Sequence, residues 1–269
     1  MKRSASILAV LLLTTMLFAA GTQESASNGD KSLKYIMEKG EIIIGLNDSF
    51  PPMGFRDTNG EIAGFDIDLA KEVCKRLGVE LKLQPIDWDA KILDLNNRNI
   101  DIIWNRLSIS DERKEKIEFS KPYIANKQII IVQPGSGISM KSDLAAKKIG
   151  IQLGSTAEDA VKSYTPVMES FTELVKYQDN VQALMDLEVG RIDAVVVDEI
   201  FGRYYLSGKP GIYKIAEDFF AAEEYAIGFR KDELAFIHAV DHVIDEMAAD
   251  GTAAEISKKW FAEDILLAR

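Results

Sequence analysis

Short apolar runs alternate with stretches of helical spacing along most of the chain. Runs rich in β-branched residues predict buried strands, and apolar residues three and four positions apart predict helices. The predicted strands are 42–46, 79–83, 100–104, 128–132, 148–152, 192–197 and 225–229. The predicted helices are 66–77, 88–96, 156–164, 180–189, 199–205, 231–249 and 252–261. Strands interleaved with helices predict an α/β architecture of parallel sheets covered by helices.

The N-terminus has the pattern of an export signal. Lys2 and Arg3 precede the apolar run 7–20, which ends in small residues. That run is shorter than the roughly 20 residues that span a bilayer, so a retained membrane anchor is the weaker alternative. We expect residues 1–21 to be a signal peptide, 22–30 a polar linker, and the mature protein to be periplasmic.

Composition excludes several classes of partner and site. The formal net charge of −11 repels phosphate backbones, so we expect no nucleic-acid partner. Cys74 is the single cysteine, and its helical spacing favours core packing over a reactive thiol. His238 and His242 in "HAVDH" share a helical face, but the glutamate of a zinc helix is absent. We therefore expect neither a metal nor a cofactor.

Polar residues follow three predicted strands, at 104–113, 150–159 and 192–201. In α/β sheets, ligands bind outside the carboxyl ends of the strands. We interpret 105–113 as the loop that leaves strand 100–104. Arg113 lies in this loop, within the charge-rich "SDERKEK", where simple solvation is the alternative to ligand binding.

Arg113 and Asp198 have complementary chemistry. The planar guanidinium of arginine matches a carboxylate, and Asp198, delivered at the end of an apolar strand, can bind an ammonium. The complementary ligand would be a zwitterion such as an α-amino acid. In the remaining turn, Gly154 permits a tight bend, and Ser155 or Thr156 can cap the following helix and leave its N–H groups for an anion. Helix capping is the alternative role for Asp198 as well.

Five motifs together resemble the family-3 extracellular solute-binding proteins, the polar amino-acid receptors of ABC importers. The resemblance extends over about residues 31–264. The motifs are "GFDIDLAKEVCKRLG", "IDIIWNRLSISDERKEKIEFSKPY", "DLAAKKIGIQLGSTAE", "GRIDAVVVDE" and "ADGTAAEISKKWF".

This resemblance implies a type II periplasmic-binding fold, in which two α/β lobes joined by two crossover strands close on a ligand. The first lobe would comprise 31–124 and 223–269, and the second 125–222. The implied protein is a monomer that captures an amino acid and delivers it to the membrane permease of an ABC importer, without being an enzyme.

The resemblance also implies roles for individual residues. Arg113 matches the carboxylate-binding arginine and Asp198 the ammonium-binding aspartate. Ser108, Ser155 and Thr156 match donors to the main-chain groups of the ligand. Phe50 and Phe65 match the aromatic walls of the ligand site. Side-chain selectivity is usually set at the positions of Asn47, Asn105 and Gln152. Core packing is the alternative for both aromatic residues, and the loop position of Phe50 makes it the better candidate.

Arg106 departs from the family, whose members generally carry a small residue there. Its side chain could turn into solvent, reach a second acid on the ligand, or crowd the site. We hypothesise a bias toward acidic ligands, with crowding as the rival.

Two other functions remain open at this point. An enzyme of the dehydratase or lyase type on the same scaffold needs an acid or base in the cleft, for which Glu158 and Glu199 are candidates. Both also fit as acids in the first turn of a helix. A sensory module would normally be joined to a membrane or signalling segment.

Overall fold

The computed structural model describes residues 29–268. The predicted signal peptide and nearly all of the predicted linker lie outside the described residues. Among the described residues, no helix combines the length and the apolar character needed to cross a membrane.

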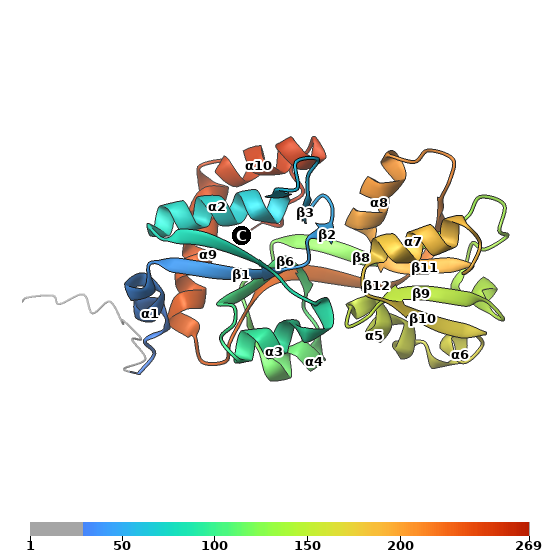
Figure 1. Ribbon diagram of the computed structural model, residues 1–269, viewed down its shortest axis with the longest axis horizontal. Coiled ribbons are helices and arrows are strands. Elements are labelled where there is room, and N and C mark those ends of the chain that lie inside the picture. Colours follow the sequence, from blue (N-terminus) through green and yellow to red (C-terminus); the bar gives the residue numbers. More distant parts are fainter. Residues whose placement is uncertain (1–28, 269) are drawn as a thin grey trace, which may run out of the picture.

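One lobe is built on three parallel strands and carries most of the N-terminal half together with the C-terminal helices (Figure 1). Its principal elements are α1 (Ser32–Lys39), β1 (Glu41–Leu46), α2 (Phe65–Leu77), β5 (Glu80–Pro85), η1 (Trp88–Ala90), α3 (Lys91–Asn96), β6 (Ile102–Ser108), α4 (Asp111–Lys116), β7 (Glu118–Phe119), α9 (Leu234–Ala249) and α10 (Thr252–Phe261). A small antiparallel sheet of β2 (Ser49–Phe50), β3 (Gly54–Arg56) and β4 (Ile62–Ala63) lies beside β1 in sequence. We call this the first lobe.

The second lobe is built on another set of parallel strands. Its elements are η2 (Lys141–Leu144), β9 (Lys148–Gln152), α5 (Thr156–Ser163), α6 (Thr165–Met168), β10 (Glu173–Tyr177), α7 (Asn180–Glu188), β11 (Ala194–Asp198) and α8 (Glu199–Ser207). β9 pairs in parallel with both β10 and β11. All five residues of β11 are buried, because helices cover both faces of the sheet.

Two long strands join the lobes. β8 (Ile124–Val132) and β12 (Lys214–Phe229) pair with each other in antiparallel fashion, β8 pairs with β11, and β12 pairs with β6. The main sheet therefore has the order β10-β9-β11-β8-β12-β6-β1-β5, with β7 on β12. Figure 1 shows β8 and β12 passing from one lobe to the other. The predicted crossovers are confirmed.

The lobes are packed against each other, which buries the polar side chains described below. Phe50 of the first lobe contacts Phe201 of the second, with ring centroids 4.7 Å apart, and both rings are buried. One hydrophobic cluster contains residues of both lobes, so the core continues across the boundary. This is a closed arrangement.

The predicted helices and strands are observed, together with several short elements that were not predicted, and β8 and β12 are longer than predicted. Two further differences concern the main sheet. β10 was not predicted: it is an edge strand whose pattern is only half buried, so its apolar signal is weak. The interpretation of 105–113 as a loop is wrong, because β6 continues to Ser108, which pairs with Tyr225 of β12. Asn105, Arg106 and Ser108 are therefore presented by a strand that is buried at every position.

Candidate functional site: a buried polar cluster between the lobes

Arg113 is buried where α4 meets the second lobe. Its Nη1 donates to the carbonyl of Ser108 at 2.8 Å, and its Nη2 donates across the lobe boundary to the carbonyl of Gly154 at 3.1 Å. Its side chain is buried, whereas those of Lys114 and Lys116 on the same short helix are exposed. The alternative that Arg113 is merely solvated is therefore wrong.

Asp198 ends β11 and is 2 % exposed. It occupies the position before α8, yet its side chain makes no capping hydrogen bond. Its Oδ1 instead accepts from Asn126 Nδ2 at 2.7 Å, Gln128 Nε2 at 3.1 Å and the Tyr225 hydroxyl at 2.7 Å. Helix capping does not explain this acid, because its partners lie on the two crossover strands.

The same amides leave two buried acceptors free. Asn126 Oδ1 and Gln128 Oε1 have no hydrogen-bond partner among the described residues. An unsatisfied buried polar atom costs on the order of 1–3 kcal/mol, so such atoms mark a place where donors are needed. Three acceptor groups, including Asp198, thus gather within one buried region.

Arg113 and Asp198 come from different lobes and act on each other electrostatically. Burial lowers the pKa of the Arg113 guanidinium, and the carboxylates of Glu223 and Asp198 are among the groups that oppose this effect. The two residues singled out from the sequence therefore lie in one buried cluster between the lobes.

Glu223, on β12, is a central member of this cluster that sequence reasoning missed. Its Oε2 accepts from Ser108 Oγ at 2.7 Å, Thr156 Oγ1 at 3.0 Å and Gln128 Nε2 at 3.0 Å. Burial, and then the negative charge of Asp198, raise its pKa. The sequence signal that could have identified Glu223 is the acidic pair Glu223–Glu224 in an extended segment. Side chains alternate between the two faces of a strand, so one acid of such a pair points inward.

The turn after β9 differs from its predicted role. Ser155 Oγ donates to the Gln152 carbonyl at 2.7 Å, and α5 begins without a side-chain cap. Thr156 Oγ1 lies 3.2 Å from Ser108 Oγ, across the lobe boundary. The expectation that either hydroxyl caps α5 is wrong, because both are used in other contacts.

The Arg106 side chain is directed into the cluster and is 2 % exposed. Its guanidinium carbon lies 3.6 Å from the Phe50 ring centroid and 4.5 Å from that of Trp88. Nη2 donates to Gln152 Oε1 at 2.6 Å, and Nη1 is 3.7 Å from Asp198 Oδ2. Rotation into solvent is therefore excluded in this structure. Trp88 was missed because it was assigned only to the start of a helix.

Asn47 and Asn105 contact the segment around the short strand β2, which carries Phe50, so the loop position predicted for Phe50 is wrong. Asn47 Oδ1 accepts from Ser49 N at 2.9 Å. The Asn105 amide, oriented to satisfy both its groups, donates to the Asn47 carbonyl at 3.1 Å and accepts from Gly54 N at 3.1 Å.

Phe65 lies in the hydrophobic core. Its ring packs edge-on against Phe261, with the centroids 5.2 Å apart. Core packing, the alternative considered from the sequence, accounts for this aromatic residue.

Lys91 is a further buried cation near the lobe boundary. Its Nζ donates to the carbonyls of Trp88, at 2.7 Å, and Gly154, at 2.9 Å. Burial lowers its pKa well below the ordinary value, and the positive charges of Arg113 and Arg106 act in the same direction. Lys91 thereby links the Trp88 segment to the second lobe.

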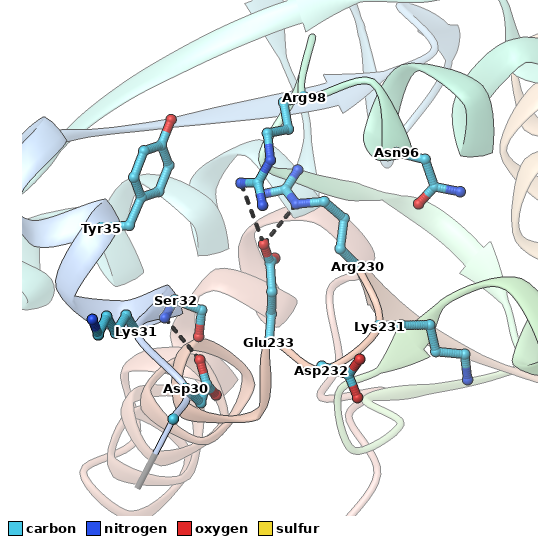
Figure 2. A pocket seen from close by; sticks show the side chains of 11 residues that line it. Asp30, Lys31, Ser32, Tyr35, Asn96, Arg98, Arg230, Lys231, Asp232 and Glu233 are labelled. Atoms are coloured by element: carbon cyan, nitrogen blue, oxygen red, sulfur yellow. Dashed lines mark hydrogen bonds and ion pairs between the residues drawn. The ribbon is translucent and has the colours of Figure 1, made fainter. Parts of the chain in front are cut away.

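Size alone does not identify the functional site. A hollow of about 640 Å³ lies at the base of the first lobe, between α1 and the segment before α9 (Figure 2). Its charged side chains are largely paired, as in the bond of 2.6 Å from Arg230 Nε to Glu233 Oε1. A smaller hollow of about 310 Å³ is lined by Arg113, Lys91 and Gly154, and it opens beside the polar cluster.

Comparison with known proteins agrees with this architecture. Residues 42–263 match the bacterial extracellular solute-binding proteins, family 3. The L-cystine-binding protein TcyJ of Escherichia coli is 31% identical over 96% of both chains, and the arginine-binding extracellular protein ArtP of Bacillus subtilis is 28% identical over 97% of this chain and 98% of its own.

Solved structures give the same result. A substrate-binding protein of an ABC uptake transporter from Streptococcus pneumoniae, with bound histidine, superposes with a TM-score of 0.85 at 36% identity, covering 89% of this chain and 99% of its own. The fold is the type II periplasmic-binding fold, with two α/β lobes joined by two crossover strands. The chain belongs to the family-3 bacterial extracellular solute-binding proteins.

Proposed function

We propose that this protein captures an amino acid between its lobes in the periplasm and delivers it, as a monomer, to the permease of an ABC importer. The observation that carries the proposal is the placement of Arg113 and Asp198 on opposite lobes within one buried cluster. The named ligands of its relatives, which are cystine, arginine and histidine, support an amino acid as the cargo.

The two ends of the ligand have separate partners in this proposal. The carboxylate binds the guanidinium of Arg113 and the hydroxyls of Ser108 and Thr156, with the N-terminus of α5 behind them. The ammonium binds Asp198 and donates to the two free acceptors, Asn126 Oδ1 and Gln128 Oε1. A zwitterion thereby satisfies buried atoms that the chain leaves without partners.

Closure follows from this division of contacts between the lobes. Only the closed form brings both sets of partners to one small molecule, so the ligand favours that form by its differential affinity. A shift from mostly open to mostly closed needs about 5.5 kcal/mol of such preference. A charge-assisted carboxylate contact and an ammonium contact, both removed from water, can supply it.

A screen of the twenty common amino acids by thermal unfolding tests the proposal. A ligand that binds only the folded protein raises Tm, by an amount that grows with its concentration above Kd. We expect at least one amino acid to raise Tm, and its amine lacking the carboxylate to have no effect. Failure of all twenty, confirmed by calorimetry, contradicts the proposal.

One observation favours the rival function, an enzyme of the dehydratase or lyase type. Glu223 is a half-buried acid with a raised pKa inside the cluster, as general acids often are. The acids considered from the sequence are engaged elsewhere: Glu158 pairs with Lys176 at 2.6 Å, and Glu199 with Arg203 at 2.6 Å. Formation of product from prephenate-like acids would support the enzyme.

Replacing Glu223 with glutamine separates the two functions. Glu223 takes hydrogen bonds from the same hydroxyls that we assign to the ligand carboxylate, so its negative charge competes with the ligand. We expect E223Q to bind the amino acid found in the screen several-fold more tightly, as measured by calorimetry at pH 7 to 8. Loss of binding would instead make Glu223 a partner of the ammonium, and loss of a measured turnover would support the enzyme.

A further inference from the structure

Arg106 occupies an environment built to receive a cation. Its guanidinium lies over two aromatic rings, Phe50 and Trp88, which attract cations through their electron-rich faces. The second lobe adds the Gln152 oxygen at 2.6 Å and the Asp198 carboxylate at 3.7 Å. We call Phe50, Trp88 and Gln152 the aromatic pocket.

The backbone conformation of Arg106 is unfavourable for a residue with a side chain. Its φ is 51°, in the left-handed region that favours glycine, and its N–H donates to Asp66 Oδ2 at 2.9 Å. Its Nε has no partner among the described residues, although it is buried. A side chain that is strained at its backbone and incompletely bonded persists because the pocket favours its charge.

We propose that Arg106 is an internal occupant of the aromatic pocket, and that it excludes arginine and other amino acids with long cationic side chains from this protein. The inference rests on the proposed function, since it concerns the side-chain end of the same ligand site. The cargo is then an amino acid with a short, neutral or acidic side chain, which ends at the guanidinium of Arg106 and can accept from its free Nε.

The physical argument is competition for one space. A ligand guanidinium could use the aromatic pocket only if Arg106 left it, which would break its contacts with both rings and its charge-assisted hydrogen bond. Two guanidinium groups in the same buried volume would repel each other. An acidic or neutral side chain meets neither obstacle.

Replacing Arg106 with glycine tests this inference. Glycine relieves the positive φ and empties the pocket, so we expect R106G to bind L-arginine at least about 100-fold more tightly than the unaltered protein does. Calorimetry measures the affinities of both proteins for L-arginine and L-alanine. The ratio of the two affinities in each protein corrects for a change in closure that affects both ligands equally. R106K, which keeps a cation in place, should retain much of the exclusion.

Arg98 supplies a matched control. It also has a positive φ, of 60°, but its side chain is 58% exposed and belongs to the first lobe outside the cluster. R98G removes the same charge and relieves the same backbone region, and we expect it to leave both affinities unchanged.

The outcomes distinguish this inference from the proposed function. A gain of arginine binding in R106G that is absent from R98G supports both the inference and the proposed function. If the unaltered protein binds L-arginine as tightly as R106G, or if R106G gains nothing while the protein binds another amino acid, the inference is overturned and the proposed function stands. If neither protein binds any of the twenty amino acids, the proposed function fails and the inference falls with it.

Discussion

Replacement of Arg113 with alanine is expected to weaken binding of the amino acid by roughly 30-fold or more, and to abolish measurable binding at the upper end of that range. The guanidinium donates to the carbonyl of Ser108, whose hydroxyl lies 3.2 Å from that of Thr156, so it lies beside the proposed carboxylate position. Truncating one partner of a buried charge pair costs about 2–5 kcal/mol, which corresponds to a loss in affinity of roughly 30-fold to several thousand-fold. The contact with Gly154 across the lobes is lost as well, so closure weakens in parallel.

Calorimetry on R113A and on a matched control measures this effect. K114A changes the adjacent residue of the same helix, whose side chain is 57% exposed, and should bind as the unaltered protein does. Thermal unfolding of R113A shows whether the fold survives. A folded R113A with unchanged affinity would remove the assignment of the carboxylate position.

Replacement of Asp198 with asparagine examines the other end of the ligand. The side chain keeps its size, so its environment among Asn126, Gln128 and Tyr225 stays filled while the negative charge is removed. We expect a loss of affinity as large as that of R113A. Tight binding by D198N would mean that the ammonium lies elsewhere.

The fold could be predicted from the sequence because the spacing of apolar residues is regular in most strands and helices. Strand 148–152 is observed at the predicted bounds. Asp198 could be chosen because it ends an apolar run, and Arg113 because its guanidinium matches a carboxylate and it follows the polar end of a predicted strand. β10 was not predicted because an edge strand buries too few side chains to produce an apolar run in the sequence. The C-terminal part of β6 was not predicted as strand because its residues are polar. They are buried by pairing with β12, which lies more than a hundred residues away in sequence.

The rest of the site depends on how the lobes meet. Glu223 reaches Ser108 and Thr156 only because the register of β12 turns it inward, and no local pattern encodes that register. Trp88 and Arg106 become neighbours only through the folded first lobe. Sequence reasoning recognised Arg106 as unusual but offered solvent, a ligand acid or crowding as its destination; its position among aromatic rings required coordinates.

Asp66 should make the stability of the protein depend on pH in the opposite sense to an ordinary salt-bridged acid. It is fully buried at the start of α2, where Oδ2 accepts from Arg106 N at 2.9 Å and Oδ1 from the Tyr123 hydroxyl at 2.8 Å. Burial raises its pKa from 3.8 to about 7, although both hydrogen bonds act in the lowering direction. The folded protein therefore binds this proton more tightly than the unfolded chain does.

The sign follows from proton linkage. Between pH 3.8 and about 7, the folded state keeps the proton of Asp66 and the unfolded state has lost it, so the free energy of unfolding falls as pH rises. A shift of this size corresponds to about 4 kcal/mol, present in full below pH 3.8 and lost above pH 7. Glu223, whose pKa is also raised, contributes in the same direction.

D66N isolates this contribution, because its amide resembles the protonated acid: Oδ1 can accept from Arg106 N while Nδ2 donates to the Tyr123 oxygen. Urea unfolding of both proteins from pH 4 to pH 8 should show the unaltered protein losing about 4 kcal/mol relative to D66N across that range. All other titrating groups are common to the two proteins and cancel in the difference. A difference that does not change with pH would mean that Asp66 stays ionised, in which case its two donors outweigh the cost of burial and anchor the Arg106 backbone through a charge.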